Sequence, residues 1–134
     1  MENLSMSKYA GLLIKCKDRY LLCKRAEEAV MPGIWSVPAG EVKSTEEPDE
    51  AAVREAFEET QIPIHVEDTA YVTTLNGSTH DGGDFYLYMS EVIDELRPIL
   101  DFEHVASGWF TRHSLPTPID GGLKDAVLGI EKTS

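Results

Sequence analysis

The chain has 134 residues, of which 42% are hydrophobic, and it carries a formal net charge of −12. This length predicts a single domain over residues 1–134, with a core large enough to do without disulfides or a structural metal. The acidic charge argues against a long nucleic acid as a partner, because contacts to a phosphate backbone need a basic face. An acidic protein also repels small phosphate compounds unless cations mediate the contact.

The N-terminal segment and the cysteines predict a cytoplasmic protein. Residues 1–8 are polar, and the apolar stretch 9–14 is too short for a secretory signal or a membrane span, so no membrane partner is expected. Cys16 and Cys23 lie on the two strands of an expected hairpin, in which Cys16 faces Arg19 rather than the other cysteine. The two sulfur atoms are then too far apart for a disulfide, which fits a reducing compartment.

The first third of the chain predicts a hairpin, a short strand and a loop. The largely apolar segment 9–16 and the segment 19–25 predict paired strands joined by a turn at residues 17–18. Residues 34–37 predict a short strand that ends at a proline. The polar segment 39–47 contains one glycine and predicts a loop.

A helix is predicted from about Pro48 to about Gln61. Proline is favoured in the first turn, and Asp49 and Glu50 complement the positive end of the helix dipole. Pro63 disfavours helical geometry at the residue before it, so the helix should end near Gln61.

The rest of the chain predicts strands and a terminal helix. Strands are expected at residues 66–75, 84–92 and 105–111, with a polar, glycine-rich loop at 76–83. A short helix is expected at residues 123–131. Strands on both sides of a central helix predict the α/β (α+β) class, with a mixed sheet and helices packed on it.

One face of the central helix gathers acidic side chains. Glu55, Glu58 and Glu59 are spaced i, i+3 and i+4, so they share a face, while Val53 and Phe57 are expected to pack against the sheet on the other side. Three carboxylates on one face repel each other, and a divalent cation would turn that repulsion into binding. The alternative is a solvated acidic face, which is the usual meaning of a charge run.

The segment around this helix resembles the Nudix box. The pattern is glycine, five residues, Glu, seven residues, Arg-Glu, an apolar residue, any residue, Glu-Glu, any residue, glycine and an apolar residue. The positions in register are Gly40, Glu46, Arg54, Glu55, Glu58, Glu59 and Ile62. A chance match at the six fixed positions is on the order of one in ten thousand.

Segments on either side extend the resemblance over most of the chain. The segment from Trp35 to Gly40, read as WSVPAG, is similar to the W-x-x-P-G-G entry of the family, and Glu103 followed by Trp109-Phe110 is similar to a later acidic loop and strand. The chain is thus identified as resembling the Nudix (MutT-like) family.

Three positions depart from the family pattern. Gln61 replaces a glycine just past the helix, where a left-handed conformation favours glycine, so we expect a slightly shifted helix end. Ala39 and Ala56 replace a glycine and a larger aliphatic residue, which affects packing and not the proposed ligands.

The resemblance implies a Nudix fold, with a mixed sheet sandwiched between helices, and a metal site for Mg²⁺ or Mn²⁺. Glu58 and Glu59 are the foremost metal ligands, with Glu55 as a third. Gly40 would offer its backbone carbonyl to the metal, or else forms only a tight turn.

Further residues support this site. Arg54 is expected to position a carboxylate such as Glu46 or Glu55, and Glu46 is more structural than ligating. Glu103 is the candidate general base or extra metal ligand, with Asp101 and Glu91 in reserve.

Substrate contacts are assigned to Arg25, Trp35 and Tyr86. Arg25 would meet a phosphate, and the aromatic side chains would stack on a base. The competing interpretations are a surface cation for Arg25 and core packing for the aromatic residues. His80, in the glycine-rich loop, borders the expected pocket or is simply solvated.

The function implied is the metal-dependent hydrolysis of a diphosphate bond in a nucleoside diphosphate linked to another moiety. The partner is then a small nucleotide of unspecified identity, and a homodimer is compatible with the resemblance. One alternative is a non-catalytic module that senses nucleotides. Another is an isomerase of prenyl diphosphates, which would need a catalytic cysteine in a different context from that of Cys16 and Cys23.

Overall fold

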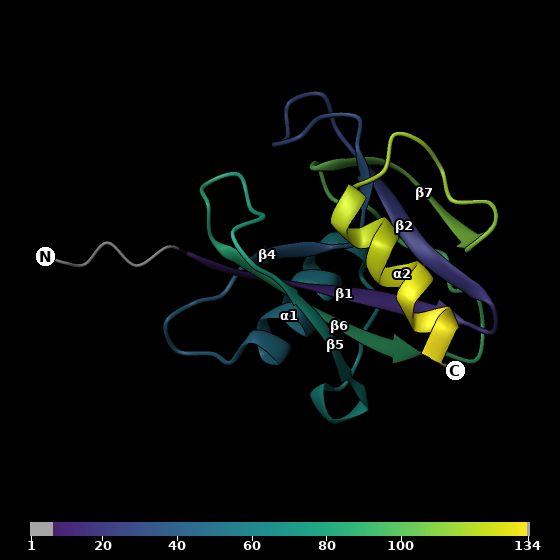
Figure 1. The fold of residues 1–134 in the computed structure, drawn as a ribbon, viewed down its shortest axis with the longest axis horizontal. Helices are drawn as coiled ribbons and strands as arrows, with labels where there is room; N and C mark the ends of the chain where they lie inside the picture. Colours follow the sequence, from purple (N-terminus) through teal and green to yellow (C-terminus); the bar gives the residue numbers. More distant parts are fainter. Residues whose placement is uncertain (1–6, 134) are drawn as a thin grey trace, which may run out of the picture.

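The computed structural model describes residues 7–133 and has a sheet of seven strands with two α-helices (Figure 1). The elements in chain order are β1 (Lys8–Cys16), β2 (Arg19–Arg25), β3 (Trp35–Ser36), β4 (Ala39–Glu41), α1 (Pro48–Thr60), the 3₁₀ helix η1 (Val66–Asp68), β5 (Ala70–Leu75), β6 (Asp84–Glu91), β7 (His104–Thr111) and α2 (Gly121–Thr133).

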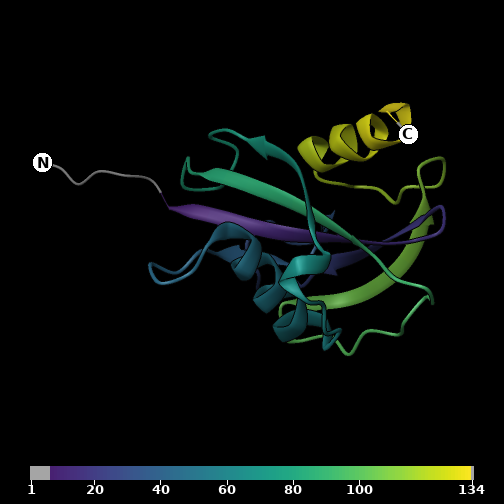
Figure 2. The ribbon, with the colours of Figure 1, turned by 90° about the horizontal axis from the view of Figure 1, so that it is seen from below.

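The sheet is mixed, as predicted, and β1 lies at its centre. β1 runs parallel to β6 on one side and pairs antiparallel with β2 and β4 on the other. β3 and β7 extend the sheet from β2, and β5 extends it from β6, all in antiparallel pairs. One helix covers each face of this sheet, α1 one side and α2 the other (Figure 2). The predicted arrangement, a mixed sheet between helices, is therefore confirmed.

Two hydrophobic clusters fill the two interfaces because side chains alternate along each strand. On β1, Ala10, Leu12 and Ile14 face α1, whereas Leu13 faces α2. The helix that packs on the second face contributes Leu123 and other buried residues. No helix in the described part of the chain has the length and apolar character needed to cross a membrane.

The packed face of α1 differs from the prediction. Its buried residues are Ala51, Ala52, Ala56, Glu59 and Thr60, whereas Phe57 is 45% exposed. The expectation that Phe57 packs against the sheet is wrong, because the short alanine side chains let this side of the helix approach the sheet closely. At 3.6 residues per turn, both Glu55 and Glu59 fall within the arc of buried residues that runs from Ala51 to Thr60, and Glu58 falls just outside it.

Several element boundaries also differ from the predicted ones. The predicted loop after β3 contains β4, because β2 pairs with β1 only at Lys15 and Cys16 and leaves the first half of that edge to β4. The strand predicted at residues 66–75 begins only at Ala70, after η1. The terminal helix begins at Gly121, before the predicted start, because the Asp120 carboxylate accepts the N–H of Leu123 at 2.9 Å.

The two cysteines behave as predicted. Cys16 pairs with Arg19 across the hairpin, and both Cys16 and Cys23 are buried, free thiols.

At the end of α1, Gln61 takes the left-handed conformation itself, with φ 65° and ψ 17°. Its backbone N–H donates to the carbonyl of Phe57 at 2.8 Å, and its side-chain amide donates to the same carbonyl at 3.3 Å. The sequence led us to expect a slightly shifted helix end, but the end is not shifted, and Gln61 itself occupies the left-handed position. Instead, a residue with a Cβ atom accepts the strain of the position that favours glycine.

Gln61→Gly should raise the free energy of unfolding by about 0.5–1 kcal/mol, because glycine adopts this conformation without strain. Urea denaturation monitored by circular dichroism measures the change. Gln61→Ala keeps the Cβ atom and is the matched control, so it should not stabilise the protein. Equal stability of the glycine and alanine variants would show that Gln61 is not strained.

Candidate active site

Arg54, on the outer side of α1, binds three carboxylates of the box. Its guanidinium contacts Glu46 through two nitrogens at 2.7 and 3.1 Å, Glu55 at 3.0 Å and Glu58 at 3.2 Å. It also donates to the backbone carbonyl of Glu41 at 3.1 Å. The hydrogen bonds from Arg54 lower the pKa of Glu46 to about 2. The predicted pairing of Arg54 with Glu46 and Glu55 is thus present, and it locks the loop before α1 onto the helix.

Glu59 lies on the opposite, buried side of the same helix. Only 3% of the residue is exposed, and its Oε1 accepts the backbone N–H of Ala39 on β4 at 3.1 Å. Burial raises the pKa of Glu59 to about 10, and the hydrogen bond to Glu55 and the charge of Glu55 add to this effect. Burial and the neighbouring Glu55 therefore favour the protonated form of Glu59 while no cation is bound.

Gly40 brings the β4 backbone against the acidic side chains. A Cβ atom at this position would lie 2.2 Å from the Glu55 carboxylate, closer than any real Cβ contact. The Glu55 carboxylate therefore occupies the space that a side chain at position 40 would fill. A side chain at position 40 would therefore displace the Glu55 carboxylate, and the role of the Gly40 carbonyl stays a prediction.

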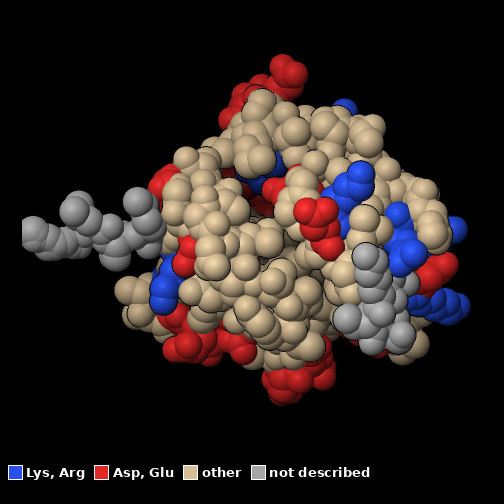
Figure 3. Space-filling view, in the orientation of Figure 1, with Lys and Arg blue, Asp and Glu red and all other residues tan. Residues whose placement is uncertain are grey.

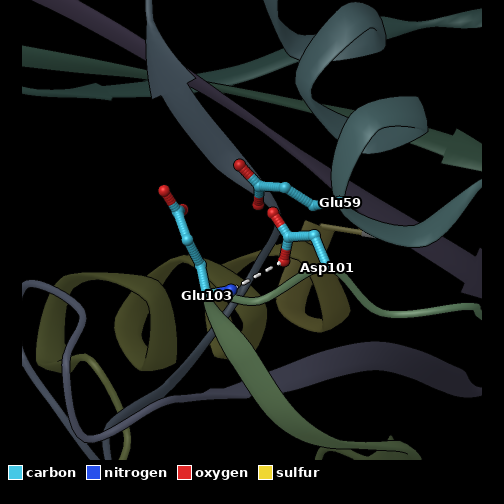
Figure 4. A group of neighbouring side chains, drawn as sticks. All are labelled: Glu59, Asp101 and Glu103. Atoms are coloured by element: carbon cyan, nitrogen blue, oxygen red, sulfur yellow. Dashed lines mark hydrogen bonds between the residues drawn. The ribbon is translucent and has the colours of Figure 1, made fainter.

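Glu59 meets two more carboxylates that come from a distant part of the sequence. One ligand oxygen each from Glu59, Asp101 and Glu103 lies within 4.8 Å of the others (Figure 4). Backbone hydrogen bonds bring them together: the N–H of Asp101 donates to the carbonyl of Glu59 at 3.3 Å, and the N–H of Ala26 donates to the carbonyl of Glu103 at 2.8 Å. The end of α1, the end of β2 and the start of β7 therefore meet at this cluster.

The cluster has the donor set and the size for a divalent cation. Hard cations such as Mg²⁺ take oxygen ligands at about 2.1 Å, so ligands on opposite sides of one ion lie about 4.2 Å apart. The three carboxylates, Glu59, Asp101 and Glu103, therefore fit one cation after small side-chain shifts. Glu55 lies next to Glu59, and Glu58 is the more exposed residue, with 52% of its side chain exposed.

Two buried side chains, those of His104 and Cys23, lie behind the cluster. The side chain of His104 is 1% exposed and lies between Asp101 and Glu59, with Nδ1 at 3.0 Å from one and Nε2 at 3.8 Å from the other. Burial raises the pKa of the Cys23 thiol to about 12, and the charges of Glu59 and Asp101 add to this effect. The sequence analysis did not single out His104, since a histidine at the start of a strand carries no motif.

A cavity of about 250 Å³ opens beside the cluster on the α2 side of the sheet. Apolar side chains such as Phe85, Leu87 and Leu123 form much of its wall, and Gly40 and Glu103 belong to the wall as well. Figure 3 shows the molecule hollowed on this face, between β4 and the start of α2, with acidic side chains at the opening. The acidic cluster and the cavity are therefore adjacent.

The predicted substrate residues lie at different places. Arg25 lines the cavity, and its Nε donates to the carbonyl of Val30. Trp35 and Tyr86 are not among the described residues that line it. Trp35 packs edge-on against Phe110, with ring centroids 5.3 Å apart, and Tyr86 packs on the α1 side of the sheet. Their roles in binding substrate stay predictions, to which the cavity lends no support.

Two other expectations can be placed in the structure. His80 borders the cavity and packs edge-on against Tyr9, with ring centroids 5.6 Å apart. Glu91, a reserve for the general base, forms an ion pair with Lys15 at 3.7 Å and does not belong to the acidic cluster. Asp101, the other reserve, does belong to it.

Solved structures of known proteins share this fold. The chain matches a MutT protein from Methanosarcina mazei with a TM-score of 0.80 and 19% identity, covering 99% of this chain and 98% of that one. It matches an Ap4A hydrolase from C. elegans with a TM-score of 0.75 and 19% identity, covering 96% and 97%. It also matches a MutT/nudix family protein from Enterococcus faecalis with a TM-score of 0.73 and 21% identity, covering 83% of this chain but only 46% of that longer one.

Sequence comparison identifies the family. No curated protein matches the chain at a significant level. The model of the NUDIX domain matches residues 7–128, which include the whole box and the three carboxylates of the cluster. The chain therefore belongs to the Nudix family of hydrolases.

Proposed function

We propose that this protein hydrolyses a diphosphate bond in a nucleoside diphosphate linked to another group, with Mg²⁺ or Mn²⁺ as the cofactor. The observation that carries the proposal is the position of Glu103, which belongs both to the acidic cluster and to the wall of the apolar cavity. A substrate seated in the cavity thus has its phosphates beside the cation ligands.

Several side chains around the cluster are the proposed ligands of the cation. Glu59 supplies a carboxylate oxygen, and Glu55 lies next to Glu59 as a further ligand. Glu58 lies on the same helix, but its carboxylate accepts a hydrogen bond from the guanidinium of Arg54. A bound divalent cation neutralises the charge of a diphosphate and acidifies water.

Two residues have supporting roles in the proposed reaction. Glu103 is the proposed general base, which accepts the proton of the attacking water, because it stands between the cluster and the cavity. Arg54 is a positioning residue that orients Glu55 and Glu58 through direct hydrogen bonds.

The lining of the cavity suits a flat, uncharged group, so we expect such a part of the substrate to enter it. Arg25 is the only lysine or arginine among the described residues of its wall, and its Nε is already bonded to a backbone carbonyl. An apolar wall with few polar groups suits a nucleobase better than a phosphate. The Ap4A hydrolase with the same fold supports a small nucleotide as the substrate. The net charge of −12 argues against long nucleic acids.

The structure gives less support to the two alternatives. Cys16 and Cys23 are both buried, and burial raises the pKa of Cys23 to about 12, so this thiol is not poised for an isomerase reaction. A module that only senses nucleotides needs cation ligands but no general base, so the position of Glu103 at the cavity wall favours hydrolysis.

The proposal is tested with a panel of nucleotides and Mg²⁺, with phosphate and pyrophosphate measured separately for each compound. We expect Glu59→Gln to lower turnover of the best substrate by about a hundredfold or more, because it removes a carboxylate from the cation site. Circular dichroism should show an intact fold. Glu67→Gln, on the exposed helix η1, is the control and should retain activity. Wild-type activity in Glu59→Gln would refute the site.

Cation binding should depend on pH, because Glu59 must lose its proton before it binds a cation. Below the raised pKa of about 10, the affinity for Mn²⁺ should rise by about tenfold per pH unit between pH 6 and 8. Calorimetry in two buffers of different ionisation enthalpy should show about one proton released. EDTA should abolish turnover, and added Mg²⁺ or Mn²⁺ should restore it. Affinity that does not change with pH would contradict a protonated Glu59.

Arg54→Lys should lower the free energy of unfolding, measured by urea denaturation, by about 1–3 kcal/mol, because an ammonium group cannot bind Glu46, Glu55 and Glu58 together.

The contribution of Glu46 to the free energy of unfolding should depend on pH in a defined direction. Its pKa is lowered from 4.5 to about 2, so the stabilisation is complete above pH 4.5 and is lost as the pH falls towards 2. Urea denaturation of wild type and Glu46→Gln at pH 7 and pH 3 measures this. A stability difference that is larger at pH 3 would contradict the ion pair.

A further inference from the structure

The buried imidazole of His104 has no part in the reaction proposed above. His104 begins β7, pairs with Arg25 across a β-bulge, and has a side chain that is 1% exposed. Polar side chains at this depth are rarely left without a partner. The two ring nitrogens of His104 face two different carboxylates of the acidic cluster, Nδ1 towards Asp101 and Nε2 towards Glu59.

The contact with Asp101 has a defined direction. His104 Nδ1 lies 3.0 Å from Asp101 Oδ1. In the tautomer that carries its proton on Nδ1, His104 donates to this carboxylate oxygen. The backbone N–H of Glu103 donates to the same oxygen at 3.2 Å. Two donors therefore occupy Oδ1, and the other oxygen of Asp101 points towards Glu59 (Figure 4).

Asp101 needs such a restraint to stay in the cluster. Its side chain is 21% exposed, so water competes for the carboxylate. The negative charge of Glu103 disfavours its approach to the other acidic side chains before a cation binds. The imidazole of His104 lies on the protected side and opposes both effects, because it fixes one oxygen and leaves the other free for a cation.

We infer that His104 is a positioning residue that holds Asp101 as a ligand of the divalent cation. The inference rests on the cation site of the proposed function and adds His104 to it, as the group that orients Asp101. A buried partner that orients a metal ligand typically contributes 10- to 100-fold to metal affinity.

A purely structural role for His104 makes a different prediction. If the imidazole only fills space, then a leucine of similar size should preserve the site, and an asparagine, which is smaller, should harm it. If His104 acts through its Nδ1 donor, the order is reversed, because the side-chain amide of asparagine places an N–H near the same point. The pair His104→Leu and His104→Asn thus separates the two roles.

The experiment measures Mn²⁺ binding to the metal-free protein by electron paramagnetic resonance of the free ion, without substrate. We expect His104→Leu to weaken Mn²⁺ binding by about 10- to 100-fold, and His104→Asn to remain within about threefold of wild type. His113→Leu is the matched control at an exposed histidine and should bind as wild type does. Thermal melts confirm that each variant is folded.

Coupling to Asp101 is tested in the same assay. Asp101→Asn should weaken Mn²⁺ binding as much as His104→Leu does, and the double variant should be no weaker than Asp101→Asn alone by more than about twofold. Additive losses would overturn the inference, because they would mean that His104 does not act through Asp101. Normal Mn²⁺ affinity in a folded His104→Leu variant, or in Asp101→Asn, would overturn it as well. If His104→Leu does not fold, a loss of affinity in His104→Asn equal to that in Asp101→Asn would also count against it.

The outcomes for the two proposals can be told apart. If the wild type binds Mn²⁺ but hydrolyses no nucleotide, the proposed function fails and the role of His104 still stands or falls by the variants. If the wild type binds Mn²⁺ and hydrolyses nucleotides while His104→Leu binds normally, only the inference on His104 fails. If the wild type binds no Mn²⁺, both fail.

Discussion

The site depends on the burial of one carboxylate in the middle of a packing interface. Glu59 lies on the face of α1 that packs against the sheet, and its pKa is raised to about 10. Close packing alone would favour an apolar residue there, because an ionised carboxylate in such a place costs folding free energy. In the proposed function, a divalent cation would remove this cost when it replaces the proton. The position that weakens the cation-free fold is therefore the one that favours cation binding.

The remaining acidic side chains fall into two groups with different electrostatic environments. Glu46, Glu55 and Glu58 surround Arg54, whose guanidinium compensates their charges and ties the loop before α1 to the helix. Asp101 and Glu103 join Glu59 in the acidic cluster, with one ligand oxygen of each residue within 4.8 Å of the others. The first group is stable without a cation, whereas the second gains from one. Under the proposed function, this division would let a protein with a net charge of −12 hold an anionic substrate.

The proposed function and the role of His104 describe successive layers of the same site. Glu103 belongs to both the cavity wall and the acidic cluster, and Glu59 belongs to both the cluster and α1. The buried imidazole of His104 lies behind both Asp101 and Glu59. Each layer restrains the one in front of it, which reduces the number of orientations that a cation ligand can adopt. A site built in this way would bind the proposed cation with less loss of side-chain entropy.

The sequence by itself determined the family, the mixed sheet between two helices, the free cysteines and the contacts of Arg54, because these follow from fixed spacings and from the alternation of side chains. It did not determine which face of α1 is buried, since the alanines and Phe57 compete for that face and only the sheet decides between them. Nor did it reveal the cluster of Glu59 with Asp101, the contact of the Glu55 carboxylate with Gly40, or the position of His104 behind the cluster. Those depend on contacts between segments tens of residues apart, and no local pattern encodes such distances.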